Sequence, residues 1–307
     1  MARLINPMIS FVVPAYNEEH ELSDTLAAIR EAASGATQPC EIIVVDDAST
    51  DATAEIASGA GAKVIPIDRR QIAAARNAGA RAAQGDYLFF IDADTRINPE
   101  HVIRGIAALE GGYVGGSARV AMDGFVPIWG RVLLCAFSSV YFGLNLGAGA
   151  FLFTTRRNFE AIGGFDEQYF AGEEVYFSIE LKKLGAFKVL REPVVTSARK
   201  LRMHSAKHFL RNFFGVIVRG SRGVRSRAGL SLWYDGKRER HPAWEQNQSR
   251  LTSPRCAVAK IDSSSTVAPS LWLRATKRRI SRSSSCMRKI PAARMCKSHF
   301  SPAGSSI

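Results

Sequence analysis

The first hundred residues alternate between short apolar runs and stretches whose apolar residues recur at helical spacing. The apolar runs predict strands at Ile9–Val13, Glu41–Val45, Lys63–Ile67 and Tyr87–Ile91. The stretches between them predict helices at Glu21–Ala33, Thr50–Ser58 and Ile72–Ala83. Strands that are apolar on both faces and separated by helices predict an α/β fold, with a parallel sheet covered on both sides.

The second hundred residues are less regular. The uncharged run from Val132 to Phe153 is 22 residues long, which is enough to span a bilayer. Its serines, Asn145 and its glycines favour a buried or interfacial helix over a spanning one, followed by a turn and a strand at Ala150–Thr154. Further helices are predicted at Asn158–Ile162 and Glu174–Leu184, a strand at Lys188–Leu190, and a basic amphipathic helix at His208–Val218.

The hydrophobic periodicity ends near residue 240. Residues 241–307 hold 14 serines and many basic residues, with no sustained period of a strand or a helix. We interpret this tail as disordered, or as the product of a reading-frame shift that replaces the native end of the chain.

Charge is distributed unevenly along the chain. The net charge is +13, but residues 1–195 hold 17 Lys and Arg against 24 Asp and Glu, whereas 196–240 and 241–307 each hold 12 against 2. Because only the last third is basic, no nucleic-acid partner is expected. The five cysteines show no metal-binding or disulfide spacing, and the amino-terminal segment lacks the features of a signal peptide, so a cytoplasmic location is expected.

Polar clusters follow three of the predicted strands: Pro14-Ala15-Tyr16-Asn17-Glu18, Asp46-Asp47-Ala48-Ser49-Thr50-Asp51 and Asp92-Ala93-Asp94. Ligands of parallel α/β sheets bind beyond the carboxyl ends of the strands, so these clusters should share one cleft. Carboxylates gathered there would repel one another unless a cation joined them, which indicates Mg²⁺ or Mn²⁺. The alternatives are that Ser49 or Thr50 caps a helix, and that Asp92-Ala93-Asp94 forms a solvated turn.

Five motifs in order, FVVPAYNEE, VVDDASTD, AAARNAGARAAQGDYLFFIDAD, GGFDE and GEEVYFSIELKKLG, resemble those of the family 2 glycosyltransferases. The resemblance covers residues 8 to about 200. It implies a GT-A (Rossmann-like) fold, a mostly parallel sheet flanked by helices, in a single domain with a basic carboxyl-terminal extension. The expected domain is 1–240, with a nucleotide-binding half at 1–110, an acceptor half at 111–240, and the tail at 241–307.

The resemblance implies a nucleotide-diphosphate-sugar donor, most simply linked to UDP, bound at the first strand ends. The nucleotide-binding residues would be Pro14, Tyr16, Asn17, Glu18, Asp46, Asp47, Arg76, Asn77 and Asp92. Tyr16 would flank the base, and Asp46 or Asp47 would accept its imide hydrogen. Arg76 and Asn77 would face the diphosphate, although Arg76 could instead be a surface arginine on an alanine-rich helix. Asp92 and Asp94 form the D-x-D motif, which would bind Mg²⁺ or Mn²⁺ between the phosphates.

The general base implied by the resemblance is Glu174, with Glu173 as the second candidate. Aspartate is commoner at this position, so the carboxylate of Glu174 lies one methylene farther along its side chain. The alternative is that both glutamates only favour the dipole of the helix that they begin. The acceptor or the sugar would lie near Gly147, Gly149, Gly164, Phe165 and Asp166, unless these glycines only form tight turns.

The function implied is transfer of a single sugar to an acceptor hydroxyl with inversion, in cell-envelope, polysaccharide or glycolipid biosynthesis. The acceptor would be lipid-linked or a saccharide, and 196–240 would hold the enzyme at an anionic membrane surface, peripheral to the inner face of the cell membrane. A nucleotidyltransferase is disfavoured because PAYNEEHEL is acidic where a phosphate loop would be basic. A membrane-surface binding protein with a relic site is the remaining alternative, and His204 is a weak candidate for a metal or phosphate contact.

Overall fold

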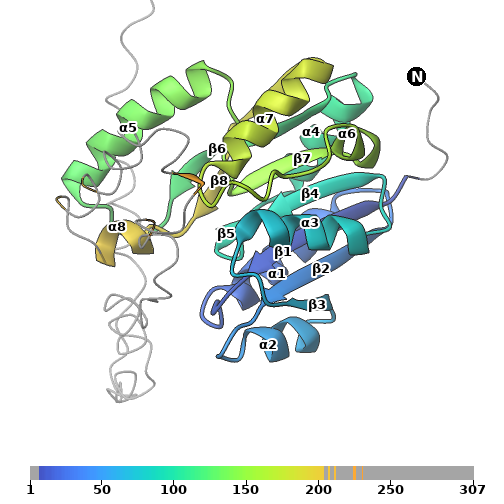
Figure 1. The fold of residues 1–307 in the computed structure, drawn as a ribbon, viewed down its shortest axis with the longest axis horizontal. Coiled ribbons are helices and arrows are strands. Elements are labelled where there is room, and N and C mark those ends of the chain that lie inside the picture. Colours follow the sequence, from blue (N-terminus) through green and yellow to red (C-terminus); the bar gives the residue numbers. More distant parts are fainter. Residues whose placement is uncertain (1–6, 204–206, 208–210, 212–223, 226–229, 231–307) are drawn as a thin grey trace, which may run out of the picture. The chain divides into compact units, whose positions relative to one another are not determined.

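The computed structural model describes residues 7–203 together with residues 207, 211, 224, 225 and 230 (Figure 1). The chain divides into two units, Met1–Gln248 and Ser249–Ile307, and every described residue belongs to the first. His204, most of the basic segment with its predicted helix His208–Val218, and the tail 241–307 lie outside the described residues.

Sixteen helices and strands follow one another in the described part of the chain. The strands are β1 (Ile9–Ala15), β2 (Cys40–Asp47), β3 (Lys63–Ile67), β4 (Tyr87–Ile91), β5 (Thr95–Arg96), β6 (Gly115–Met122), β7 (Phe151–Thr155) and β8 (Phe187–Thr196). The helices are α1 (Leu22–Ser34), α2 (Thr53–Gly59), α3 (Ile72–Ala82), α4 (Pro99–Glu110), α5 (Ile128–Gly143), α6 (Arg156–Ala161), α7 (Glu173–Leu184) and α8 (Arg199–Met203).

All eight strands form one sheet in the order β3-β2-β1-β4-β7-β6-β8-β5. The β3, β2, β1 and β4 strands pair in parallel, as the alternation of strands and helices predicts. The β7 strand runs antiparallel to both β4 and β6, and β6 pairs in parallel with β8. The sheet is therefore mostly parallel and carries the carboxyl ends of β1, β2 and β4 side by side.

Two hydrophobic cores cover the two faces of the sheet, because alternate residues of each strand point to opposite faces. One core joins Phe11 and Phe89 to α1 and α4, and the other joins Val12 and Phe90 to α3, α6 and α7. In Figure 1 the α3 helix lies across β1, β2 and β4 in front of the sheet. Every side chain of β4 is buried, which explains its uninterrupted apolar sequence.

The helix α3 packs unusually close to the sheet. A Cβ atom at Gly79 would lie 2.2 Å from Cγ1 of Val12 and 3.0 Å from Cγ2 of Val45. Only glycine fits this approach, which agrees with the close packing expected there.

The sequence prediction missed four elements, β5, α4, β6 and α8, and found β8 only in part. The predicted helix, turn and strand of residues 132–153 are present as α5, the loop after it and β7. Among the helices of the described residues, none combines the length and the apolar character needed to cross a membrane.

Candidate active site

The carboxyl ends of β1, β2 and β4 meet around a pocket of about 120 Å³. Side chains on its wall include Tyr16, Asp47, Arg70, Asp92, Asp94 and Arg199. The three polar clusters that follow the strands thus gather at one edge of the sheet, where ligands of such sheets bind. We call this space the strand-end pocket.

The backbone is strained at the same edge. Among the described residues, the four non-glycine residues with positive φ are Asn17 (52°), Ala48 (59°), Arg70 (50°) and Asn145 (55°). The first three lie within three residues of the ends of β1, β2 and β3. Such conformations cost about 1–3 kcal/mol each and concentrate at functional sites.

Asp47 fixes the loop that borders the strand-end pocket. Its carboxylate accepts hydrogen bonds from the backbone N–H groups of Arg69 (2.7 Å), Arg70 (2.8 Å) and Gln71 (2.7 Å). With both oxygens engaged in this way, Asp47 holds the loop that leads into α3. The carboxylate of Asp46 accepts a hydrogen bond from the backbone of Ser49 at 3.3 Å.

The polar residues after β2 bind the loop after β1 instead of capping a helix. The hydroxyl of Ser49 accepts a hydrogen bond from the backbone of Asn17, and the backbone of Thr50 donates to the Asn17 side chain. The residue before α2 is Ala52, which offers no side-chain cap, and the N–H of Thr53 at the start of the helix donates to the carboxylate of Asp51 at 3.0 Å. The capping role expected for Ser49 or Thr50 is therefore wrong, and these residues tie two strand ends together.

Tyr16 and Arg70 stack at the pocket. The guanidinium carbon of Arg70 lies 3.3 Å from the centre of the Tyr16 ring. A nucleobase could therefore flank this face of Tyr16 only after Arg70 moved. Pro14 and Glu18 line the same pocket, and Glu18 is buried, with 7% of its surface exposed.

Arg76 lies behind the D-x-D motif with only 1% of its surface exposed. Its Nη2 atom is 2.8 Å from Oδ1 of Asp92 and 2.9 Å from the Gly149 carbonyl, and its Nη1 atom is 2.8 Å from Oε1 of Glu173. Burial lowers its pKa most strongly of all influences, but the carboxylates of Asp92, Glu173 and Glu174 together raise the pKa above its ordinary value. Arg76 thus ties the D-x-D motif to the start of α7, and contact with a diphosphate remains a prediction.

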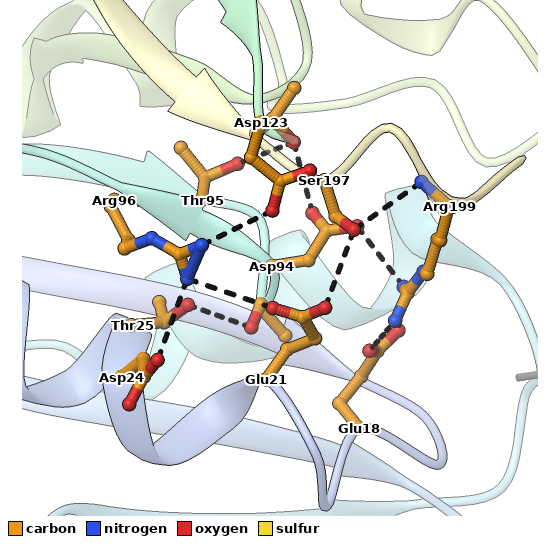
Figure 2. Close-up of polar contacts among 12 residues, drawn as sticks. Glu18, Glu21, Asp24, Thr25, Asp94, Thr95, Arg96, Asp123, Ser197 and Arg199 are labelled. Carbon is orange, nitrogen blue, oxygen red and sulfur yellow. Dashed lines mark hydrogen bonds and ion pairs between the residues drawn. The ribbon is translucent and has the colours of Figure 1, made fainter. Parts of the chain in front are cut away.

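Asp94, the second carboxylate of the motif, is held by Arg199 from the start of α8 (Figure 2). Oδ2 of Asp94 is 3.1 Å from Nη2 of Arg199, and its Oδ1 accepts a hydrogen bond from Thr196 at 3.2 Å. The same guanidinium forms a bidentate pair with Glu18, at 2.5 and 2.6 Å.

The D-x-D carboxylates are the oxygen ligands that Mg²⁺ and Mn²⁺ prefer. Acidic side chains also outnumber basic ones around them, so the chemistry of the site fits a divalent cation. Each carboxylate is however already paired with a guanidinium, Asp92 with Arg76 and Asp94 with Arg199. In the described part of the chain, no group of three His, Cys, Asp or Glu side chains is arranged to hold a metal ion.

A larger cavity of about 720 Å³ adjoins the strand-end pocket, because Asp92 and Asp94 line both spaces. Glu174 and Gly149 lie on the wall of this cavity. The rest of the wall is mainly apolar, with Val126, Leu134, Tyr141, Phe142 and Leu201 among its residues. We call this space the α5 cavity, since α5 supplies much of its wall.

Glu174 is a carboxyl group of the α5 cavity whose pKa is shifted strongly by its surroundings. Burial, followed by the negative charge of Glu173, raises the pKa of Glu174 to about 8. The hydroxyl of Tyr141 lies 3.4 Å from its Oε1 and donates to the Gly147 carbonyl at 2.7 Å. A carboxyl group with this pKa exchanges protons near neutral pH, as a general base must.

The other predicted site residues lie apart from these two spaces. The side chain of Asn77 bonds the backbone of Phe165 in both directions, at 2.8 and 2.9 Å, and a third hollow of about 530 Å³ is lined by Asn77, Gly164, Phe165 and Asp166. Gly164 has a φ of +78°, so a tight turn explains this glycine. Gly147 packs closely against Leu152.

Three residues of the site were not found from the sequence. They are Arg70, Tyr141 and Arg199, each of which contacts at least one group far along the chain. Arg199 is 105 positions from Asp94 and sits in a run of basic residues that we interpreted as a membrane-binding segment. The positive φ of Arg70 could not be predicted from the sequence either, because positive φ is normally expected at glycine and this position holds arginine.

Comparison with known proteins assigns the family. Residues 10–161 match the model of glycosyl transferase family 2. The undecaprenyl-phosphate 4-deoxy-4-formamido-L-arabinose transferase of Serratia proteamaculans is 34% identical over 119 residues, 36% of this chain and 36% of that protein. The succinoglycan biosynthesis protein ExoO of Rhizobium meliloti is 34% identical over 134 residues, 41% of this chain and 36% of that protein. The matches thus span about a third of the length of these relatives.

Solved structures show the same fold. A mannosyltransferase from Pyrobaculum calidifontis in complex with GDP-Man and Mn²⁺ has a TM-score of 0.51 at 18% identity, over 81% of this chain and 76% of that chain. Mannosyl-3-phosphoglycerate synthase from Rubrobacter xylanophilus also has a TM-score of 0.51, at 23% identity, over 70% and 73% of the two chains. At this identity the likeness concerns the fold alone, and it confirms the expected GT-A class.

The motifs, the fold and the family model agree. Residues 10–161 belong to glycosyl transferase family 2.

Proposed function

We propose that the chain transfers one sugar from a nucleotide-diphosphate sugar, most simply a UDP-sugar, to the hydroxyl of a lipid-linked acceptor, with inversion. The observation that carries this proposal is that the strand-end pocket and the α5 cavity meet at Asp92 and Asp94. A donor in the first space and an acceptor in the second would place their reacting atoms at this junction.

In the proposed reaction, an oxygen of the acceptor attacks the anomeric carbon of the donor sugar. The bond from that carbon to the oxygen of the β-phosphate breaks, and its electron pair leaves with the nucleoside diphosphate. The proton of the acceptor hydroxyl passes to the carboxylate of Glu174, which lines the cavity and has its pKa raised to about 8. The higher proton affinity makes this carboxylate a stronger base than an exposed glutamate, once it is ionised.

Asp92 and Asp94 are the residues proposed to hold Mg²⁺ or Mn²⁺. A bound divalent cation would neutralise part of the charge of the diphosphate. Arg76 keeps the backbone of Gly149 and the carboxylates of Asp92 and Glu173 in fixed positions. It therefore holds the donor side of the site and the start of α7 in register, which is the precondition for proximity catalysis.

The lipid character of the acceptor is supported by the apolar surface around the α5 cavity. Phe125, Ile128 and Val132 have 69%, 79% and 66% of their surface exposed. Exposed apolar groups beside a cavity are typical of binding sites for apolar ligands. Phe125 and Arg131 both line the cavity, so the wall also offers a positive group to a lipid phosphate. The protein of Serratia proteamaculans named above acts on undecaprenyl phosphate by its name. Peripheral attachment to the membrane and a role in the cell envelope belong to the same proposal.

The test is transfer by the purified full-length chain. UDP-, GDP- and dTDP-sugars are offered in turn with a polyprenyl-phosphate-linked acceptor or a water-soluble saccharide, and the product is detected by mass spectrometry. We expect transfer to the lipid-linked acceptor, reduced about 100-fold or more by Glu174→Gln. Glu180→Gln is the matched control, because Glu180 lies on the same helix and its exposed carboxylate pairs with Lys183.

The proposal would be wrong if the folded protein gave no product with any donor. Full activity of the Glu174→Gln variant would leave the family and the donor in place but remove Glu174 as the base. Transfer to the soluble saccharide alone would replace the lipid-linked acceptor by a saccharide.

A further inference from the structure

Arg199 connects the end of the described chain to two strand ends. It is the first residue of α8 and has only 7% of its surface exposed. Figure 2 shows its guanidinium between the carboxylates of Glu18 and Asp94. The pair with Glu18 is bidentate, whereas the contact with Asp94 is a single one of 3.1 Å. The two contacts are therefore unequal, and the one with Asp94 is the easier to break.

The surroundings keep the backbone on both sides of this contact in place. The backbone N–H of Ser197 donates to the Asp94 carbonyl at 3.2 Å, and β5 pairs with β8 through Thr95 and Thr196. The nearby Arg96 has its own partners, with Glu21, Asp24 and Asp123 within 3.8 Å. A rearrangement that frees Asp94 therefore requires only the side chain of Arg199 to move.

The charges around the strand-end pocket make such a movement depend on a ligand. Its wall holds four carboxylates, of Glu18, Asp47, Asp92 and Asp94, against the guanidinium groups of Arg70 and Arg199. A buried carboxylate that loses its partner with no replacement costs several kcal/mol. A divalent cation would take the place of Arg199 beside Asp94, but the guanidinium of Arg199 would then have lost its contact with this carboxylate. A diphosphate provides the acceptor atoms that this guanidinium needs.

We propose that Arg199 is a resident counter-cation of the D-x-D motif, which holds Asp94 until a divalent cation and a diphosphate arrive together. Arg199 then leaves Asp94 to the cation and turns to the diphosphate. The cation and the nucleotide accordingly bind with positive coupling, and the cation alone binds weakly. This inference rests on the proposed nucleotide-sugar donor, but its first test needs no nucleotide.

The first test is titration of Mn²⁺ alone into the full-length protein, followed by electron paramagnetic resonance of free Mn²⁺. We expect weak binding to the wild type and about tenfold tighter binding to Arg199→Gln, because the competing charge is gone. Arg202→Gln is the matched control: Arg202 lies on the same helix, contacts Asp123, and should leave Mn²⁺ binding unchanged. Equal Mn²⁺ affinity of the wild type and a folded Arg199→Gln variant would overturn the proposal.

The second test is the coupling between Mn²⁺ and UDP or GDP. We expect the nucleotide to tighten Mn²⁺ binding to the wild type about tenfold or more, and the gain to shrink to within about threefold in Arg199→Gln. Arg199→Lys keeps the positive charge but loses the planar guanidinium, so its gain in Mn²⁺ affinity should lie between those of the wild type and Arg199→Gln. This variant replaces Arg199→Gln in the test if Arg199→Gln does not fold. If the nucleotide binds to the wild type without tightening the binding of Mn²⁺, the proposal is overturned. Failure of both nucleotides to bind at all would instead count against the proposed function.

Discussion

Replacing Arg76 by methionine should destabilise the protein strongly, because it leaves the buried carboxylate of Glu173 without its ion-pair partner. Glu173 has 4% of its surface exposed and Arg76 has 1%, and their atoms are 2.8 Å apart. Loss of one partner of such a buried pair costs about 3–5 kcal/mol. The contact with Asp92 adds less, since 35% of that side chain is exposed and solvent weakens the pair. For a domain of about 200 residues, this loss lowers Tm by roughly 6–20 °C.

The free energy of unfolding can be measured by urea denaturation followed by circular dichroism. The double variant Arg76→Met with Glu173→Gln should recover about 2 kcal/mol of the loss, because it no longer buries an unpaired carboxylate. Arg104→Met is the matched control: Arg104 pairs with Glu100 on the exposed face of α4, and its loss should change stability by less than about 0.5 kcal/mol. A loss below about 1 kcal/mol for Arg76→Met, or a double variant that is less stable than the single one, would refute this reasoning.

Further predictions concern helix packing and the proposed base. Gly79→Ala should cost about 1–3 kcal/mol in urea denaturation, because its Cβ would lie 2.2 Å from Val12. Gly59→Ala is the control: its added Cβ would meet no atom within 4 Å, so its effect on stability should be neutral or slightly favourable. Equal changes in stability for Gly79→Ala and Gly59→Ala would contradict the close approach of α3 to the sheet. Turnover should rise as the pH increases through about 8, where Glu174 loses its proton, and a profile already flat above pH 6 would exclude it as the base.

The strands of the amino-terminal half could be predicted almost to the residue because burial on both faces leaves a plain sequence signal. The prediction at Tyr87–Ile91 matches β4, whose side chains are all buried. The prediction at Lys63–Ile67 also matches β3, although this edge strand is only partly buried. The strand β6 gives no such signal, since it begins with Gly115 and Gly116. A Cβ at Gly116 would lie 2.2 Å from the ring of Phe153. The glycine is therefore required by contact with a residue distant in sequence, which the local sequence does not reveal. The helix α4 could have been found from Asn98 and Pro99, which form a helix start with a capping box.

The candidate site could be predicted only as far as local sequence positions its residues. The acidic groups at the ends of β1, β2 and β4 follow from strand order, because parallel strands end at the same edge. The partners of these groups do not follow, since Arg76 points inward from α3 and Arg199 arrives from the far end of the described domain. Charge composition even suggested another role for Arg199, because a run of basic residues has the same signal whether its members are exposed or paired. The pairing of each D-x-D carboxylate with its own arginine is therefore visible only in the folded chain.

The central claim of this account is that the strand-end pocket binds the nucleotide of a sugar donor. Isothermal titration of UDP and GDP in the presence of Mn²⁺ tests it most directly, with the wild type beside Asp94→Asn, which keeps the size of the side chain. We predict saturable binding of one nucleotide to the wild type, weakened about tenfold or more in the variant, because the proposed cation loses a charged ligand. Binding of neither nucleotide to the folded wild type, or equal binding to both proteins, would contradict it.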